Sequence, residues 1–318
     1  MATHTSVSGE QVSQPDPQLT DVKQADIQKA VLGQLEQFLQ VCLDRAEGPG
    51  SPPRLCAAIR HAVMPGGARI RPRISLSVAM ACAGEPSKAA FGGAAAIELL
   101  HCASLVHDDL PCFDDADIRR GKPSVHKAFD ERLAILAGDA AIVMAFEALS
   151  IGCEGSPTVL AKMLPVVAAS VGAPVGIAAG QAWECEPHAD LSAYHDAKTG
   201  ALFAAAAELG AISAHHPDQQ GWRKFGERLG LAYQIADDIR DVAGNAKELG
   251  KPVGQDDALG RPNAVRALGL PNAVGRLEGL LRKAIDELPE APGRDALARQ
   301  IDHETHKLLP NHIWALAD

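Results

Sequence analysis

The chain has 318 residues, of which 47% are apolar, and its formal net charge is −10. This length allows a large hydrophobic core, and the acidic balance argues against nucleic acid as a partner, because phosphate backbones are bound by clustered Lys and Arg. The seven cysteines have no CxxC spacing, which argues against a disulfide framework or a zinc site and favours a reducing, cytoplasmic location.

The N-terminal segment, residues 1–19, is predicted to be a disordered tail. It is polar, contains Pro15 and Pro17, and lacks the apolar stretch of a secretory signal. Residues 20–318 contain no evident linker and are interpreted as a single domain. No apolar run in the chain is expected to be long and uncharged enough to span a bilayer.

The domain is predicted to be all-α. Segments rich in Ala and Leu show helical periodicity between Gly and Pro residues, whereas alternating β-branched runs are nearly absent. The expected helices cover residues 20–46, 52–63, 67–83, 86–109, 131–152, 157–172, 175–184, 191–213, 218–243, 262–287 and 293–307.

The segment 86–109 is apolar almost throughout and ends in His107, Asp108 and Asp109. An apolar helix of this kind lies in a protein interior. Its C-terminal end already carries the negative end of the helix dipole, so carboxylates there are unfavourable. This conflict indicates that a cation binds at the end of the helix.

Two acidic clusters are candidate metal sites. The first has five carboxylates in ten residues, and Pro111 interrupts the helix so that the chain can fold back and bring Asp114 near Asp108. The second contains Asp237, Asp238 and Asp241, of which the first and last share a helix face. Mg²⁺ fits both clusters, because it uses one or two carboxylates together with substrate phosphates. Solvated acidic turns are the alternative, and the spacing of a calcium-binding EF-hand is absent.

Basic residues beside Gly or Pro are candidate phosphate ligands. Arg offers a planar fork of donors and Lys a point charge, and Gly allows a ligand to approach the backbone. Together they predict a metal-free diphosphate site beside the metal-bound one, and therefore a reaction with two substrates. The groups lie at 66–72 with Arg69 and Arg71, at 119–123 with Arg119 and Arg120, at 198–200 with Lys198 and Thr199, and at 250–252 with Lys251.

Taken together, these motifs resemble the trans-isoprenyl diphosphate synthases over about residues 30–265. Residues 101–129 resemble the first aspartate-rich motif of that family and residues 233–254 the second. The segments GGxRxRP at 66–72, GQ at 180–181 and KTG at 198–200 follow in the family's order. The text of 101–129 is most similar to bacterial geranylgeranyl diphosphate synthases of carotenoid pathways.

The resemblance implies an antiparallel helix bundle around a deep central cavity, usually a homodimer. The residues it links to Mg²⁺, directly or behind the metal ligands, are Asp108, Asp109, Asp114, Asp237, Asp238 and Asp241. For the allylic diphosphate it implies Arg119, Lys198, Thr199, Gln234 and Lys251, and for isopentenyl diphosphate Arg71, His101 and Arg120. The residues expected to act directly in catalysis are Asp108, Asp114, Lys198, Asp237 and Lys251.

The chain departs from the family pattern at several positions. The family usually has Lys at the position of Ala68, so either Arg69 compensates or isopentenyl diphosphate binds more weakly. Tyr233 replaces a Phe, and Arg240 replaces a common apolar residue in the second motif. The tail after Leu308 lacks the family's basic ending.

The resemblance also predicts the product. Ala103 and Ser104 precede Asp108 by about one helical turn, and bulky aromatic residues at these positions stop growth at fifteen carbons in the family. Small residues there predict geranylgeranyl diphosphate, made from isopentenyl diphosphate and a dimethylallyl, geranyl or farnesyl starter, although they also allow simple close helix packing. The rival interpretations are a farnesyl diphosphate synthase, a class I terpene cyclase and a non-catalytic regulatory subunit of a hetero-oligomeric synthase.

Overall fold

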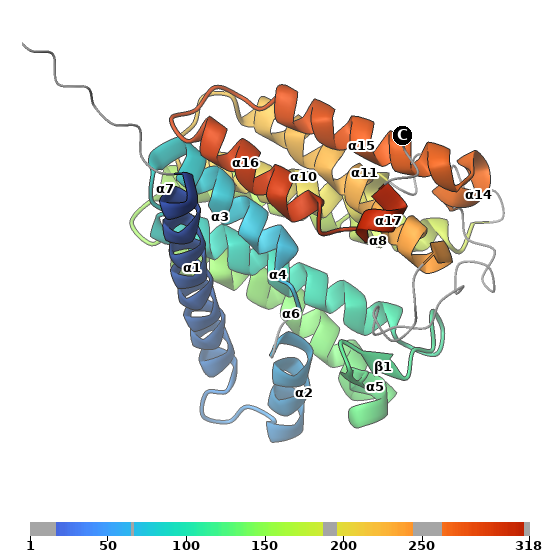
Figure 1. The fold of residues 1–318 in the computed structure, drawn as a ribbon. Coiled ribbons are helices and arrows are strands. Elements are labelled where there is room, and N and C mark those ends of the chain that lie inside the picture. Colours follow the sequence, from blue (N-terminus) through green and yellow to red (C-terminus); the bar gives the residue numbers. More distant parts are fainter. Residues whose placement is uncertain (1–16, 65–66, 187–195, 244–262, 315–318) are drawn as a thin grey trace, which may run out of the picture.

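The computed structural model describes residues 17–64, 67–186, 196–243 and 263–314, and most of them are helical (Figure 1). The helices of the N-terminal half are α1 Pro17–Ala46, α2 Pro53–Val63, α3 Ile70–Ala83, α4 Lys88–Asp108, α5 Val125–Ala128, α6 Glu131–Gly152 and α7 Pro157–Val171. Those of the C-terminal half are α8 Ile177–Trp183, the π-helix η1 Asp196–Gly200, α10 Ala201–Ser213, α11 Gln219–Ala243, α14 Ala264–Leu268, α15 Leu270–Asp286, α16 Arg294–Thr305 and α17 Asn311–Trp314.

The all-α prediction is confirmed, and most predicted helices begin and end within three residues of the observed ones. Helix α1 begins at Pro17 rather than at 20, while residues 1–16 of the predicted tail lie outside the described residues. The predicted helix 262–287 is divided in two, because Gly269 has a φ of 79° and ends α14. The start of the predicted helix 191–213 also lies outside the described residues.

A small β-hairpin was not predicted. Strands β1 Ile118–Arg119 and β2 Lys122–Pro123 pair antiparallel, and Arg120 and Gly121 at the turn have φ values of 54° and 75°. Two positive φ angles in succession are typical of the tight turns that match the twist of a hairpin. The basic segment is therefore a rigid turn that presents two arginines after the end of α4.

Helix α4 lies at the centre of the bundle. One core cluster joins α4 to α1, α2, α6 and α7, and a second joins α11 to α3, α15 and α16. Helix α10 is buried along its whole length and contributes side chains to both clusters. Small residues bring α4 close to α6, since a Cβ on Gly92 would lie 2.8 Å from the Cα of Gly152. Helices α4 and α11 both end at the same end of the bundle, at the right in Figure 1, so the two aspartate clusters are delivered there.

Two helices of the bundle are long and strongly apolar. By length and composition alone, α4 and α6 could each cross a membrane. In the folded chain 83% of the apolar window of α4 is buried against other helices, as in the core helix of a globular bundle, and 44% of that of α6.

Candidate functional site

The first aspartate cluster is a loop that folds back on the end of α4. The amide of Asp114 donates to the carbonyl of Asp108 at 2.9 Å, and the amide of Ala116 donates to the carbonyl of Asp109 at 3.1 Å. Asp115 adopts a positive φ of 44° at this bend. The prediction that Pro111 allows Asp114 to return to Asp108 is therefore confirmed.

The two aspartates at the end of α4 have different surroundings. Asp109 is buried, and its Oδ1 accepts hydrogen bonds from Nε and Nη2 of Arg119 at 2.9 and 2.5 Å. Burial raises the pKa of Asp109, and the Arg119 guanidinium opposes that effect. Asp108 is partly exposed, and its Oδ1 accepts from Nε2 of Gln181 at 2.8 Å. Asp109 is thus an internal ion-pair partner, whereas Asp108 remains partly exposed beside Gln181.

Gln181 of α8 is a site residue to which the sequence analysis gave no role. Its Nε2 donates to Asp108 and lies 3.4 Å from the carbonyl oxygen of Ser104. The GQ pair at 180–181 belongs to the family pattern, but the sequence alone does not show which residue Gln181 contacts. Gln181 orients the Asp108 carboxylate and ties α8 to the predicted chain-length position.

The second cluster likewise contains one buried aspartate that bonds within the protein and one that is more exposed. Asp238 is 1% exposed. Its Oδ1 accepts from Nε2 of Gln234 at 2.9 Å, and its Oδ2 accepts from the backbone amide of Ala264 at 2.7 Å. Thr199 donates to the Oε1 of Gln234 at 2.6 Å, which completes a chain of contacts from η1 through α11 to α14. Asp238 therefore holds protein segments together rather than facing outward.

Asp237 is the outward member of the second cluster, with 45% of its side chain exposed. Its Oδ1 accepts from Nη2 of Arg240 at 3.0 Å. Asp241, one turn further along α11, is buried. Among the described residues, no group of three or more His, Cys, Asp or Glu side chains lies close enough to hold a metal ion by itself. This arrangement suits Mg²⁺, which combines one or two carboxylates with water and substrate phosphates.

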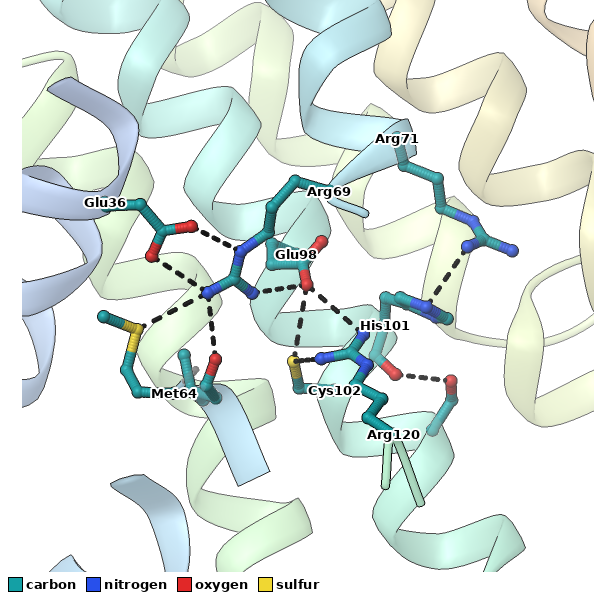
Figure 2. A network of polar contacts seen from close by, with 10 residues as sticks. Glu36, Met64, Arg69, Arg71, Glu98, His101, Cys102 and Arg120 are labelled. Carbon is teal, nitrogen blue, oxygen red and sulfur yellow. Dashed lines mark hydrogen bonds and ion pairs between the residues drawn. The ribbon is translucent and has the colours of Figure 1, made fainter. Parts of the chain in front are cut away.

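Arg71, His101 and Arg120 form a partly buried basic group (Figure 2). Arg71 donates from Nη1 to Nε2 of His101 at 3.2 Å, and its guanidinium lies 4.7 Å from the ring centre of Phe203. Burial lowers the pKa of Arg71 to about 10, while the carboxylates of Glu98 and Asp237 act in the opposite direction. Asp237 therefore lies within electrostatic range of Arg71.

His101 is neutral in this basic environment. Burial lowers its pKa well below the ordinary value, and Arg71 and Arg120 lower it further. Because Arg71 donates to Nε2, the ring proton is assigned to Nδ1. His101 can therefore offer an N–H donor to an anion without being charged.

The structure does not agree with a substrate-binding role for Arg69. Arg69 is 3% exposed, and its guanidinium donates to Glu36 at 2.8 and 3.1 Å, to Glu98 at 2.6 Å and to the carbonyl of Val63 at 2.9 Å (Figure 2). Every nitrogen of the guanidinium already has an acceptor. Arg69 is an internal ion-pair partner and is not placed to compensate for Ala68, which is exposed and uncharged.

We expect Glu98→Gln to lower the free energy of unfolding by about 2 kcal/mol, less than the 3–5 kcal/mol of a fully broken buried pair because Glu36 still binds Arg69. Glu98 is buried and also lies 3.5 Å from Arg120. Urea unfolding with a constant m value measures the change. Glu278→Gln, which removes a surface pair with Arg282, is the control, and equal stability of both variants would contradict the ion-pair assignment.

The remaining predicted residues are placed only in part. Ala103 is buried on α4, and Ser104 beside it is partly exposed, with its hydroxyl donating to the carbonyl of His101 at 2.9 Å. Lys251 lies outside the described residues, and the side chain of Lys198 in η1 is likewise outside them.

Known proteins resemble this chain in sequence and in fold. A family model described as "Polyprenyl synthetase" matches residues 52–295. The chain is 48% identical over 281 residues to a geranylgeranyl diphosphate synthase of Cereibacter sphaeroides, covering 88% of this chain and 97% of that protein. It is 49% identical over 279 residues to a geranylgeranyl diphosphate synthase of Rhodobacter capsulatus, covering 86% and 96%. A solved geranyltransferase of Helicobacter pylori, complexed with magnesium and isoprenyl diphosphate, superimposes with a TM-score of 0.77 at 28% identity, covering 93% of this chain and 99% of that one.

Proposed function

The chain belongs to the polyprenyl synthetase family, and from that membership we propose that it condenses allylic diphosphates with isopentenyl diphosphate, head to tail, to give geranylgeranyl diphosphate. The observation that carries the proposal is the identity of 48% and 49% to two proteins named for that product, over nearly their whole lengths. The prenyltransferase activity itself follows from the family. A role in carotenoid formation and a cytoplasmic location are further parts of the proposal.

The two aspartate clusters fit a magnesium site. Asp108, Asp114 and Asp237 would bind the metal directly. The buried Asp109, Asp238 and Asp241 would not contact it and would instead hold the surrounding protein segments in place. When bound, Mg²⁺ supplies the positive charge that stabilises a leaving diphosphate. The magnesium in the related geranyltransferase supports this assignment.

The basic residues would divide between two diphosphates. Arg119, Lys198, Thr199, Gln234 and Lys251 would bind the allylic one. Arg119 is already oriented by Asp109, so little side-chain entropy is lost when a phosphate binds. Arg71, His101 and Arg120 would bind isopentenyl diphosphate, with His101 donating from its neutral ring.

The apolar helices would protect the reaction from water. An allylic cation is quenched by water, and the buried lengths of α4 and α10 provide walls without polar side chains along most of their surface. The basic group would hold the double bond of isopentenyl diphosphate close to that cation and aligned with it. The departing pyrophosphate is the expected acceptor of the final proton.

We also propose a homodimer that uses the exposed face of α6. Ile135, Leu136 and Val143 are large apolar residues of this helix with exposed fractions of 45%, 51% and 69%. Exposed apolar surface of this kind commonly marks an interface. We expect Val143→Glu to shift the protein from dimer to monomer in light scattering, with Val175→Glu, at an exposed position outside α6, as the control. Identical masses for both variants would contradict this interface.

Incubation of the purified protein with farnesyl and isopentenyl diphosphates and Mg²⁺ tests the proposed function. We expect a twenty-carbon product. Failure to extend farnesyl diphosphate, with extension of the geranyl starter, would indicate a farnesyl diphosphate synthase. A cyclised hydrocarbon formed without isopentenyl diphosphate would indicate a terpene cyclase. If no starter is turned over, the chain would be a non-catalytic subunit.

A further inference from the structure

Arg240 is the residue of the second motif that the proposed function does not use. It occupies the same face of α11 as Tyr233 and Asp237, which precede it by seven and three positions. Its Nη2 donates to Asp237 at 3.0 Å, and 31% of its side chain is exposed. Its Nε is buried and has no hydrogen-bond partner among the described residues. A buried N–H without an acceptor is unfavourable until a ligand supplies one.

Tyr233, on the same face of α11 as Arg240, approaches Arg71 of the basic group through the ring of Phe203. The ring of Tyr233 lies 4.9 Å from that of Phe203, and Arg71 lies over the same Phe203 ring at 4.7 Å. Tyr233 is also within electrostatic range of Arg71, Arg73 and Arg240. The rings of Phe203 and Tyr233 therefore lie between Arg71 and α11, and Arg240 follows Tyr233 about two turns further along the same face of that helix.

Two residues near Arg71 in the sequence, Ala68 and Arg69, do not add a free positive charge to the basic group. Ala68 carries no charge, and the donors of Arg69 are occupied by Glu36 and Glu98. Among the described residues, the positive charges of the basic group are therefore those of Arg71 and Arg120, because His101 is neutral. A further arginine on the facing helix would supply the missing positive charge.

A metal at Asp237 would change the position of Arg240. A divalent ion and a guanidinium that share one carboxylate oxygen repel each other strongly at such short separations. Arg240 is therefore expected to leave Asp237 when the metal binds there, and the partly open side of α11 allows it to move.

On the basis of the proposed function, we propose that Arg240 binds the diphosphate of isopentenyl diphosphate and that metal binding at Asp237 releases it to do so. Arg240 thereby provides the cation absent at Ala68. The order of binding follows, because the metal-linked allylic diphosphate completes the site for the second substrate.

Steady-state kinetics of Arg240→Leu test the first part. We expect the KM for isopentenyl diphosphate to rise roughly tenfold, the size of a lost hydrogen bond to a charged group, with kcat and the allylic KM within about twofold of wild type. Arg240→Lys, which retains the charge, should have a KM for isopentenyl diphosphate between those of wild type and Arg240→Leu. The control is Arg228→Leu, which removes an ion pair with Glu287 on the same helix and should change neither KM. An unchanged KM for isopentenyl diphosphate in Arg240→Leu would overturn the proposal.

Equilibrium binding tests whether metal binding at Asp237 releases Arg240 to bind isopentenyl diphosphate. Isopentenyl diphosphate is titrated calorimetrically into each protein in EDTA, and again with Mg²⁺ and an allylic thiolodiphosphate, whose sulfur-linked diphosphate leaves slowly. Wild type and Arg240→Leu should bind alike in EDTA, and only wild type should bind more tightly in the second condition. Equal affinities of the two proteins in the second condition would overturn the inference alone, whereas no binding by wild type in either condition would overturn the proposed function.

Discussion

Asp108→Ala is expected to lower kcat about a thousandfold, the range seen when a group that stabilises developing charge is removed. Asp108 lies at the C-terminal end of α4, where the negative end of the helix dipole favours a bound cation. Its carboxylate is oriented by Gln181 at 2.8 Å. The measurement is kcat with farnesyl and isopentenyl diphosphates at saturating Mg²⁺.

Asp117→Ala is the matched control, because Asp117 lies in the same loop but pairs with Lys127 at 3.0 Å on the exposed side. A surface pair of this kind contributes about 0–1 kcal/mol, so this variant should keep most of the activity. If Asp108→Ala retained activity close to that of Asp117→Ala, the metal assignment would be wrong.

Ala103→Phe is expected to shorten the main product from twenty to fifteen carbons. Ala103 is buried on α4 about one turn before Asp108, at the position where the family resemblance implies that the growing chain passes. A phenyl ring there would occupy the space of the last isoprene unit. Product length is measured by chromatography of the dephosphorylated products.

An added ring in a packed interior costs about 1–3 kcal/mol, so the thermal melting of the variant is measured beside its products. Ser104→Phe at the neighbouring, partly exposed position tests the same idea with less strain, and Ser104→Ala is the small control, which should still give twenty carbons. If both Phe variants are folded and active and still make the twenty-carbon product, the depth of the cavity at these positions does not set its length.

The helical architecture could be predicted because local signals agree with the fold. The expected helix 131–152 matches α6 in both bounds, since Asp130 caps it by accepting from the amide of Leu133 at 2.9 Å and no proline interrupts it. The β-hairpin at 118–123 has only two residues in each strand, too few for any periodic pattern. The break at Gly269 depends on a single backbone angle.

The site could be predicted as a set of residue types but not as a set of contacts. The aspartate clusters and the arginines near them were identified, yet nothing in the sequence separates Asp108 from Asp109 or Asp237 from Asp238. That separation comes from Arg119 and from the amide of Ala264, which approach by tertiary packing. Arg69 was assigned to substrate for the same reason, since its partners Glu36 and Glu98 are 33 and 29 positions away in the chain.

The central claim is that the ends of α4 and α11 hold one diphosphate between them through divalent metal ions. A crystal grown with inorganic pyrophosphate and Mn²⁺ in place of Mg²⁺ tests it most directly, because anomalous scattering locates each metal. The account predicts metal ions on both sides of a single pyrophosphate, one coordinated by Asp108 and another by Asp237, at metal–oxygen distances of about 2.1 Å. Metal at only one of the two clusters, or a separate anion at each, would contradict it.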